Sequence, residues 1–332
     1  MKKILLIALL PLLLLLSCEK EKEEDNNDDN GTTGAGTDYS FSSIYDGETI
    51  YDIDFYNETT YFAGLTNGYY FGDDLDYDLS DLQRVNVVEK IINTENEIWL
   101  ATNDGLKRIR RNDVNIGYGF PHVFDIALLD DDFLYYTTKE GLFKFDKNAQ
   151  TPPFSESITL PDLTQYVEAP YSVSDAFPFR VFIDSQERIW LIYMSGGVLM
   201  NDGTYWQHFH NGNSGLRSNA IRSIIESEDG TIYIGQWQGG LAKYENGELQ
   251  AVDINERNDF SVWAMEFDKD GNLLVGTWNG FYVLNPREDA WDFYNGIEQF
   301  GFGYKVRTFE TDPDGIIWMG LESRGIIRIN VN

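Results

Sequence analysis

Short apolar stretches of about five residues recur along most of the chain, and turn-forming residues separate them. Asp-Gly and Asn-Gly pairs mark many of the turns, as at Asp229-Gly230, Asp314-Gly315 and Asn279-Gly280. No stretch keeps a helical periodicity for longer than a turn or two. Apolar runs of this length between such turns are typical of antiparallel strands joined by hairpins. The pattern therefore predicts an all-β protein.

One unit recurs seven times: an apolar stretch, an acidic or Asn/Gly turn, an aromatic-apolar pair, a small residue, and a glycine that opens the next apolar stretch. The closing glycines are Gly68, Gly105, Gly141, Gly197, Gly240, Gly280 and Gly325. A period near 40 residues with about four short strands is the signature of a β-propeller blade. The unit therefore predicts a seven-bladed β-propeller of four-stranded blades. A six-bladed ring, with the weak first copy as irregular structure, is the alternative.

The two ends of the repeat region predict how the ring closes. The last copy ends at its third strand, near Ile329, whereas residues 39–45 precede the first copy and have no blade of their own. An N-terminal strand that completes the last blade would leave no sheet edge at the seam. We therefore expect residues 38–332 to form the propeller.

The first residues resemble a lipoprotein export signal. Lys2 and Lys3 precede the apolar run 4–16, and Ser17 and Cys18 follow at once. Leu15-Leu16-Ser17-Cys18 resembles a bacterial lipobox, so we expect residues 1–17 to be the signal peptide and Cys18 to be lipidated. Residues 18–37 are acidic and glycine-rich, which is typical of a flexible tether. An ordinary signal with a chance cysteine is the alternative.

The charge and the cysteine content of the chain limit the classes of molecule that it can bind. The chain of 332 residues carries 25 Lys and Arg against 55 Asp and Glu, a formal charge of -30. Such a charge repels nucleic acid and anionic lipid headgroups, and it favours a neutral or cationic ligand over a polyanionic one. Cys18 is the single cysteine, so an internal disulfide or a thiolate metal cluster is excluded. We expect no cofactor, and contact with the membrane only through the lipid.

Two segments carry a family resemblance. Residues 229–235, leading into Gly240-Leu241, and residues 206–219 look like the two-component regulator propeller repeat, and the resemblance extends over residues 45–330. It implies a periplasmic domain like those of hybrid histidine kinases in Bacteroidetes, whose propellers bind oligosaccharides. The sequence differs from those sensors because it has one propeller's worth of repeats and no immunoglobulin-like connector, membrane span or kinase. The resemblance therefore implies extracytoplasmic ligand binding but not signalling.

The loops on one face of the ring are the expected ligand-binding positions. Trp237 and Trp278 share one loop position in consecutive copies and stand between polar residues, where folding needs no large aromatic. Exposed indoles stack on sugar rings, although packing across a neighbouring blade is the alternative. The candidate ligand-binding residues are Trp237, Trp278, Trp263, Gln236, Gln238, Asn279, Asn103, Glu322, Arg180 and Tyr304.

Function is expected to be binding. We predict a lipid-anchored outer-membrane protein, exposed at the cell surface, whose propeller binds an oligosaccharide without catalysing a reaction. A protein-interaction platform is one alternative. A propeller lyase or glycoside hydrolase is the other, and its candidate groups are Asp104, Glu140, Glu322 and His122. Residues 268–272 resemble the start of a calcium loop but lack the later bidentate glutamate, so we expect a hairpin turn and no metal.

Overall fold

The structure is a computed structural model of the chain. It describes residues 39–45, 49–55, 60–65, 68–73, 87–94, 97–110, 116–254, 260–287, 290–296 and 303–331. All of these belong to the second of two units, Thr33–Asn332. The expected signal peptide, Cys18 and the tether lie outside the described residues. Within the described ranges, no helix has the length and apolar character needed to cross a membrane.

Six antiparallel sheets have four strands each in the part of the chain that the structure describes. The first two contain β5 (Val88–Asn93), β6 (Glu97–Thr102), β7 (Gly105–Arg110) and β8 (Ile116–Tyr118), then β9 (Asp125–Leu128), β10 (Phe133–Thr138), β11 (Gly141–Asp146) and β12 (Ser155–Ile158). The next two contain β13 (Pro178–Ile183), β14 (Ile189–Tyr193), β15 (Val198–Asn201) and β16 (Trp206–Phe209), then β17 (Ile221–Glu226), β18 (Ile232–Gln236), β19 (Gly240–Glu245) and β20 (Glu248–Val252). The last two contain β21 (Ala264–Phe267), β22 (Leu273–Gly276), β23 (Gly280–Asn285) and β24 (Ala290–Asn295), then β25 (Val306–Thr311), β26 (Ile317–Leu321), β27 (Gly325–Val331) and β1 (Tyr39–Tyr45).

The first repeat forms a smaller sheet. Its described residues make the three strands β2 (Ile50–Phe55), β3 (Thr60–Leu65) and β4 (Gly68–Asp73). The prediction of seven four-stranded blades is therefore wrong in number, because the described residues form six. The outer strands β16 and β24 are rich in aromatic residues, whereas residues 74–86, which follow β4, are acidic and lie outside the described part.

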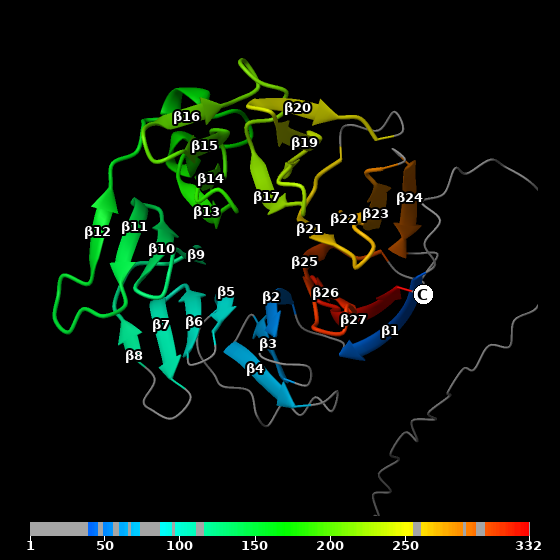
Figure 1. Ribbon diagram of the computed structural model, residues 1–332, viewed down its shortest axis with the longest axis horizontal. Helices are drawn as coiled ribbons and strands as arrows, with labels where there is room; N and C mark the ends of the chain where they lie inside the picture. The colour runs from blue at the N-terminus through cyan, green and yellow to red at the C-terminus, as the bar shows by residue number, and fades with distance from the viewer. Residues whose placement is uncertain are drawn as a thin grey trace, which may run out of the picture. The chain divides into compact units, whose positions relative to one another are not determined.

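The sheets stand around a central axis, with the first strand of each repeat innermost (Figure 1). Neighbouring sheets contact one another through these inner strands, and β2 contacts both β5 and β25, which brings the ring to closure. The three-stranded sheet therefore lies between the sheet of β5–β8 and the sheet that contains β25–β27. Two 3-10 helices, Thr164–Tyr166 and Val173–Asp175, lie in the long connection between β12 and β13.

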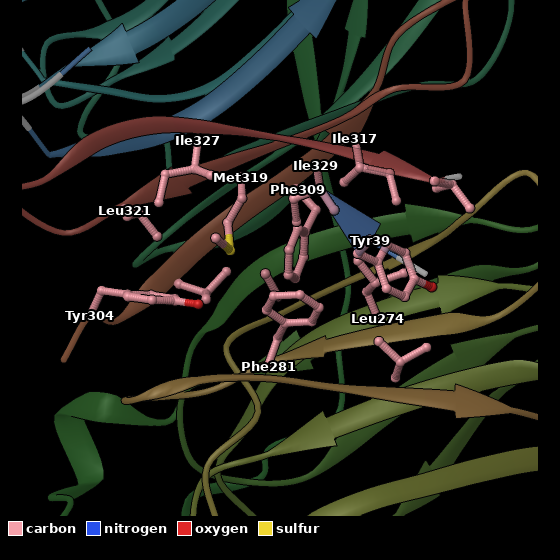
Figure 2. Close-up of a cluster of buried hydrophobic side chains, with 14 residues drawn as sticks. Tyr39, Leu274, Phe281, Tyr304, Phe309, Ile317, Met319, Leu321, Ile327 and Ile329 are labelled. Atoms are coloured by element: carbon pink, nitrogen blue, oxygen red, sulfur yellow. The ribbon is translucent and has the colours of Figure 1, made fainter. Parts of the chain in front are cut away.

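The predicted seam is confirmed. β1 pairs antiparallel with β27, from Tyr39 opposite Val331 to Ser43 opposite Ile327, and completes the last sheet in the order β1-β27-β26-β25. The hydroxyl of Tyr39 also donates a hydrogen bond to Asp268 on the preceding blade, at 2.6 Å. Figure 2 shows Tyr39 in the cluster of buried side chains that joins these two blades. The N-terminal strand is thus tied to its own sheet by the backbone and to the neighbouring sheet by a side chain.

Tryptophans inside the blades fill the space between sheets. Trp99, Trp190 and Trp318 are all nearly or fully buried. The indole of Trp190 donates to Asp184 at 2.6 Å, and that of Trp318 donates to Asp312 at 2.9 Å. These aspartates lie in the hairpin turns. These two aspartates therefore satisfy buried indoles instead of facing solvent as free charges.

The turn that resembles a calcium loop has the same structural use. Oδ1 of Asp268 accepts hydrogen bonds from the backbone amides of Asp270 and Asn272, at 2.9 and 2.8 Å. Its Oδ2 accepts from the hydroxyl of Tyr39 and from the side-chain amide of Asn272. Both oxygens therefore close and anchor a hairpin turn.

Candidate functional site at the mouth of the central channel

A β-bulge in several innermost strands turns one side chain toward the mouth of the channel. The pairing of β17 with β18 passes from Ile221 to Ser223 and leaves Arg222 out of register. The same irregularity occurs at Phe179 in β13 and at Arg307 in β25. It occurs again at Tyr51 in β2 and at Glu89 in β5. A bulge adds one residue to a strand and re-aims its side chain, and such features are common beside functional sites.

Two more residues take the equivalent place in the remaining sheets. The amide of Phe124, directly before β9, donates to the carbonyl of Thr137 at 2.9 Å, and the amide of Trp263, directly before β21, donates to that of Gly276 at 2.9 Å. Each of the seven sheets thus contributes one residue at the same register. These residues line a cavity of about 300 Å³ together with Arg180 and Met194; they are Tyr51, Glu89, Phe124, Phe179, Arg222, Trp263 and Arg307. We call this space the mouth cavity.

The charged residues of the mouth cavity are mostly arginines. Arg180, Arg222 and Arg307 line it, and Glu89 is its one lining carboxylate. Glu89 lies 3.2 Å from the Nε2 atom of His122. Among the described residues, no carboxylate lies within ion-pair distance of any of the three guanidinium groups. The cavity therefore has a positive balance inside a strongly negative chain.

Aromatic rings surround the arginines. The guanidinium of Arg222 lies over the rings of Trp237 and Trp263, with its carbon 5.3 and 5.5 Å from their centroids. That of Arg307 lies 4.7 Å from the ring centroid of Tyr51. Cations over ring faces are held in place by the ring quadrupole. The mouth cavity thus alternates flat apolar surfaces with fixed hydrogen-bond donors.

Three tryptophans form one cluster beside the cavity. Trp237, Trp263 and Trp278 pack edge to face, with ring centroids 5.3 to 6.1 Å apart. The amine of Lys305 lies 3.6 Å from the centroid of Trp263 and is paired with Glu322 at 2.8 Å. The sequence placed these side chains on one face, and the structure brings them together around Lys305.

Beyond the cluster, the surface continues into a second hollow. Trp237 and Trp278 line a cavity of about 290 Å³ with Gln238 and Asn279. Trp278 is 47% exposed, whereas Trp237 is half-buried. Trp263 belongs to both the cluster and the mouth cavity, so the two hollows are neighbours on one face of the ring. An extended ligand could therefore contact both.

Other candidates from the sequence are placed differently. Gln236 is fully buried, where its Oε1 accepts hydrogen bonds from the amides of Arg217 and Ser218 at 2.7 and 3.0 Å. Tyr304 is 2% exposed and lies among the core side chains of Figure 2. Both side chains are buried and line neither cavity, so the structure does not place them where the sequence led us to expect a ligand contact. Asn103 is exposed but is not among the residues that line either cavity.

The groups named for an enzyme do not gather at the mouth. Asp104 lies 3.5 Å from the amine of Lys107 on a hairpin, Glu140 is exposed on another, and Glu322 pairs with Lys305. None of the three lines the mouth cavity, whereas His122 contacts two of its lining residues, Glu89 at 3.2 Å and the ring of Phe124 with centroids 4.2 Å apart. The residues that the sequence analysis missed are Tyr51, Glu89, Phe124, Arg222 and Arg307.

Carboxylates on the inner strands bind the neighbouring sheets. Asp52 on β2 accepts a hydrogen bond from the amide of Ile91 on β5 at 2.8 Å, and it pairs with the amine of Lys90 at 3.0 Å. Asp125 on β9 likewise accepts from the amide of Val181 on β13 at 2.9 Å. Inner strands of different blades share no backbone ladder, so these side chains supply the hydrogen bonds between them.

Burial disturbs the titration of these groups. Burial raises the pKa of Asp54 and of Asp125 to about 6, and it raises the pKa of Glu266 to about 7. The pKa of Glu310 is raised well above its usual range by burial and by repulsion from Glu266. Burial opposes the charge on Lys90, but Asp52 and other carboxylates surround its amine and the pKa of the amine is raised overall. The inner strands thus carry an acidic cluster that is costly to ionise.

Solved structures place the fold in the class of β-propellers. The extracellular domain of a hybrid two component system from B. thetaiotaomicron superposes with a TM-score of 0.65 and 16% identity, over 87% of this chain and 40% of that one. A second such domain from the same organism gives 0.64 and 17%, over 90% and 39%. This chain therefore spans about two fifths of the length of those domains.

Virginiamycin B lyase from Staphylococcus aureus, in a structure with quinupristin, is also similar, with a TM-score of 0.66 and 12% identity over 89% of this chain and all of that one. At these identities the likeness shows the fold alone. No protein-family description and no curated protein matches the sequence. The resemblance to two-component sensor repeats therefore has support from the propeller fold of extracellular sensor domains.

Proposed function

We propose that this chain is a cell-envelope protein whose propeller binds a saccharide at the mouth cavity. The observation that carries the proposal is the ring of seven equivalent positions, each of which turns one side chain toward the same space. A core position would be apolar in every copy. These positions instead hold four aromatic residues, two arginines and one glutamate, a mixture that suits recognition better than packing.

The chemistry of the surface supports a sugar. Aromatic faces such as those of Trp263 and Phe179 match the apolar C-H faces of a pyranose ring, and guanidinium groups donate to hydroxyls and ring substituents. The neighbouring hollow adds Trp278 beside the amide side chains of Gln238 and Asn279. Two adjacent hollows of this kind fit an oligosaccharide, whose successive units each make a weak contact.

The proposal also assigns the protein a place in the cell envelope. The sequence order before Cys18 supports a lipid anchor, and the acidic segment 18–37 supports a tether between the anchor and the propeller. The similarity to extracellular domains agrees with a place in the envelope. On this proposal the protein is held at the outer membrane and displays the mouth cavity to external saccharides.

A glycan array probed with the labelled full chain tests the binding proposal. We expect saturable binding to one class of oligosaccharide. Trp278→Ala should weaken that binding several-fold with an unchanged melting temperature, because the side chain is exposed. Tyr205→Ala is the matched control, since Tyr205 is 63% exposed on a turn that lines neither cavity. Absence of any glycan signal, or equal losses in both variants, would refute the proposal.

A further inference from the structure

The charge of the mouth cavity is opposite to that of the chain. The whole chain has a formal charge of -30, yet three arginines and one glutamate line this cavity. Charges farther away than about 8 to 10 Å are largely screened at physiological salt. The field that a bound ligand meets is therefore set by the lining residues and their nearest neighbours.

Arg222 is a buried arginine whose hydrogen-bond partners carry no charge. It is 6% exposed, and its Nη1 donates to the carbonyl of Ile221 and to the sulfur of Met194, both at 3.0 Å. Its Nη2 donates to the hydroxyl of Tyr171. All of these acceptors are neutral, so they fix the guanidinium without balancing its charge. Burial lowers the pKa of Arg222, and the nearby charge of Arg180 lowers it further.

The other two arginines extend the positive surface. Nε of Arg180 donates to the backbone carbonyl of Arg222 at 3.1 Å, which places the two guanidinium groups on adjacent inner strands. Asp125 offsets part of the charge of Arg180, since Arg180 opposes the rise in the pKa of Asp125 that burial causes. Arg307 approaches the cavity from β25, held by the ring of Tyr51. A buried cation without a partner is costly, and a bound anion would remove that cost.

We propose that the mouth cavity takes an acidic saccharide, with the carboxylate or sulfate group of one sugar unit bound by Arg222 and Arg307. Guanidinium groups bind such anions through paired, charge-assisted hydrogen bonds. The sugar ring carrying the anion then lies against Trp263 and Phe179. This inference rests on the proposed saccharide-binding function and specifies its ligand class. It replaces the neutral or cationic ligand that the net charge of the chain favours.

Calorimetry with matched ligands tests the inference on the full chain in detergent. The probes are a tetramer of galacturonic acid, its methyl ester, a sulfated oligosaccharide and the desulfated form of that oligosaccharide. We expect an acidic probe to bind about tenfold or more tightly than its neutral counterpart, and to lose this advantage in 0.5 M salt. A carboxylate probe that binds without the sulfated one, or the reverse, identifies which anionic group is recognised.

Single substitutions of the lining arginines test whether these residues cause the preference for an acidic ligand. Arg222→Gln and Arg307→Gln should each reduce the preference for the acidic probe over its neutral counterpart about tenfold, because each removes a positive charge from the cavity lining. Arg307 is only half-buried, so its variant gives a result if Arg222→Gln fails to fold. Arg287→Gln is the control, because Arg287 is exposed on the turn between β23 and β24. It should change neither affinity.

The outcomes separate the two proposals. If the neutral and acidic probes bind equally, the inference about charge is wrong and saccharide binding stands. If the wider glycan array and all four probes give no binding, both proposals fail. If an acidic peptide of matched charge binds as tightly as the acidic sugar and displaces it, the site recognises negative charge without the sugar, and the inference is again wrong.

Discussion

Replacing Glu266 by glutamine should stabilise the protein at alkaline pH. Glu266 lies on β21, and burial raises its pKa to about 7. The backbone amide of Phe267, the charge of Lys90 and the hydroxyl of Thr311 favour its ionised form. Burial is the largest of these effects, so ionisation of Glu266 in the folded protein costs free energy. Glutamine keeps the shape and the hydrogen-bonding capacity of the side chain but cannot ionise.

The magnitude follows from linkage. A carboxyl group whose pKa rises from 4.5 in the unfolded chain to about 7 in the folded protein destabilises folding by roughly 3 kcal/mol once both states are ionised. Below about pH 4 the group is protonated in both states and contributes nothing. The cost therefore accumulates as the pH rises from about 4.5 to about 7, and it stays constant above that range. Glu266→Gln should remove it.

Denaturant unfolding and thermal melts at pH 4.5 and pH 8 measure this effect. At pH 8 the variant should be more stable than the wild type by on the order of 3 kcal/mol, or roughly 5 °C or more in melting temperature. At pH 4.5 the two proteins should differ little. Glu248→Gln on the exposed side of β20 is the control and should behave like the wild type at both values. An equal effect of Glu266→Gln at both pH values, or destabilisation at pH 8, would refute the reasoning.

Two further predictions concern the ends of the chain. Deleting residues 38–45 should remove the β1 partner of β27 and the anchor of Tyr39, so the melting temperature should fall clearly and the exposed edge should promote association. Deleting residues 19–37 should do neither, and equal melting temperatures for the two truncations would contradict this role of β1. Cys18→Ala should abolish labelling by a fatty-acid analogue and release the protein from detergent-extracted membranes. Unchanged fractionation of that variant would argue against a lipid anchor.

The architecture could be predicted because several local signals agree. Hairpin turns, strand length and the aromatic-apolar pair of the repeat each predict the same blade, and Trp99, Trp190 and Trp318 fill the space between sheets. The N-terminal strand could be assigned because the last copy lacked a fourth strand. The first copy is the weakest match to the repeat, and its described sheet has three strands.

The site was only partly predictable, because a repeat shows which loop positions are equivalent but not how each neighbouring side chain points. The shared loop position identified Trp237 and Trp278, which line the second hollow. The adjacent Gln236 is instead turned inward, where its side-chain oxygen accepts from the amides of Arg217 and Ser218. In a strand or tight turn, neighbouring residues point in different directions, so a position next to an exposed tryptophan is not itself exposed. The polarity of a residue therefore does not show whether its side chain contacts a ligand or hydrogen-bonds the backbone of its own loop.

The bulged positions offered a signal that the closing glycines did not. In every copy an apolar residue opens the inner strand and the next residue varies in chemistry, as in Ile221-Arg222, Val262-Trp263 and Val306-Arg307. A buried position repeated seven times would stay apolar, so variation at a fixed register next to apolar residues indicates a surface that all blades share. The net charge of the chain conceals this surface, because it sums 55 acidic residues over the whole sequence, whereas three arginines and one glutamate line the mouth cavity. The charge of the ligand is therefore better inferred from these seven positions than from the net charge of the whole chain.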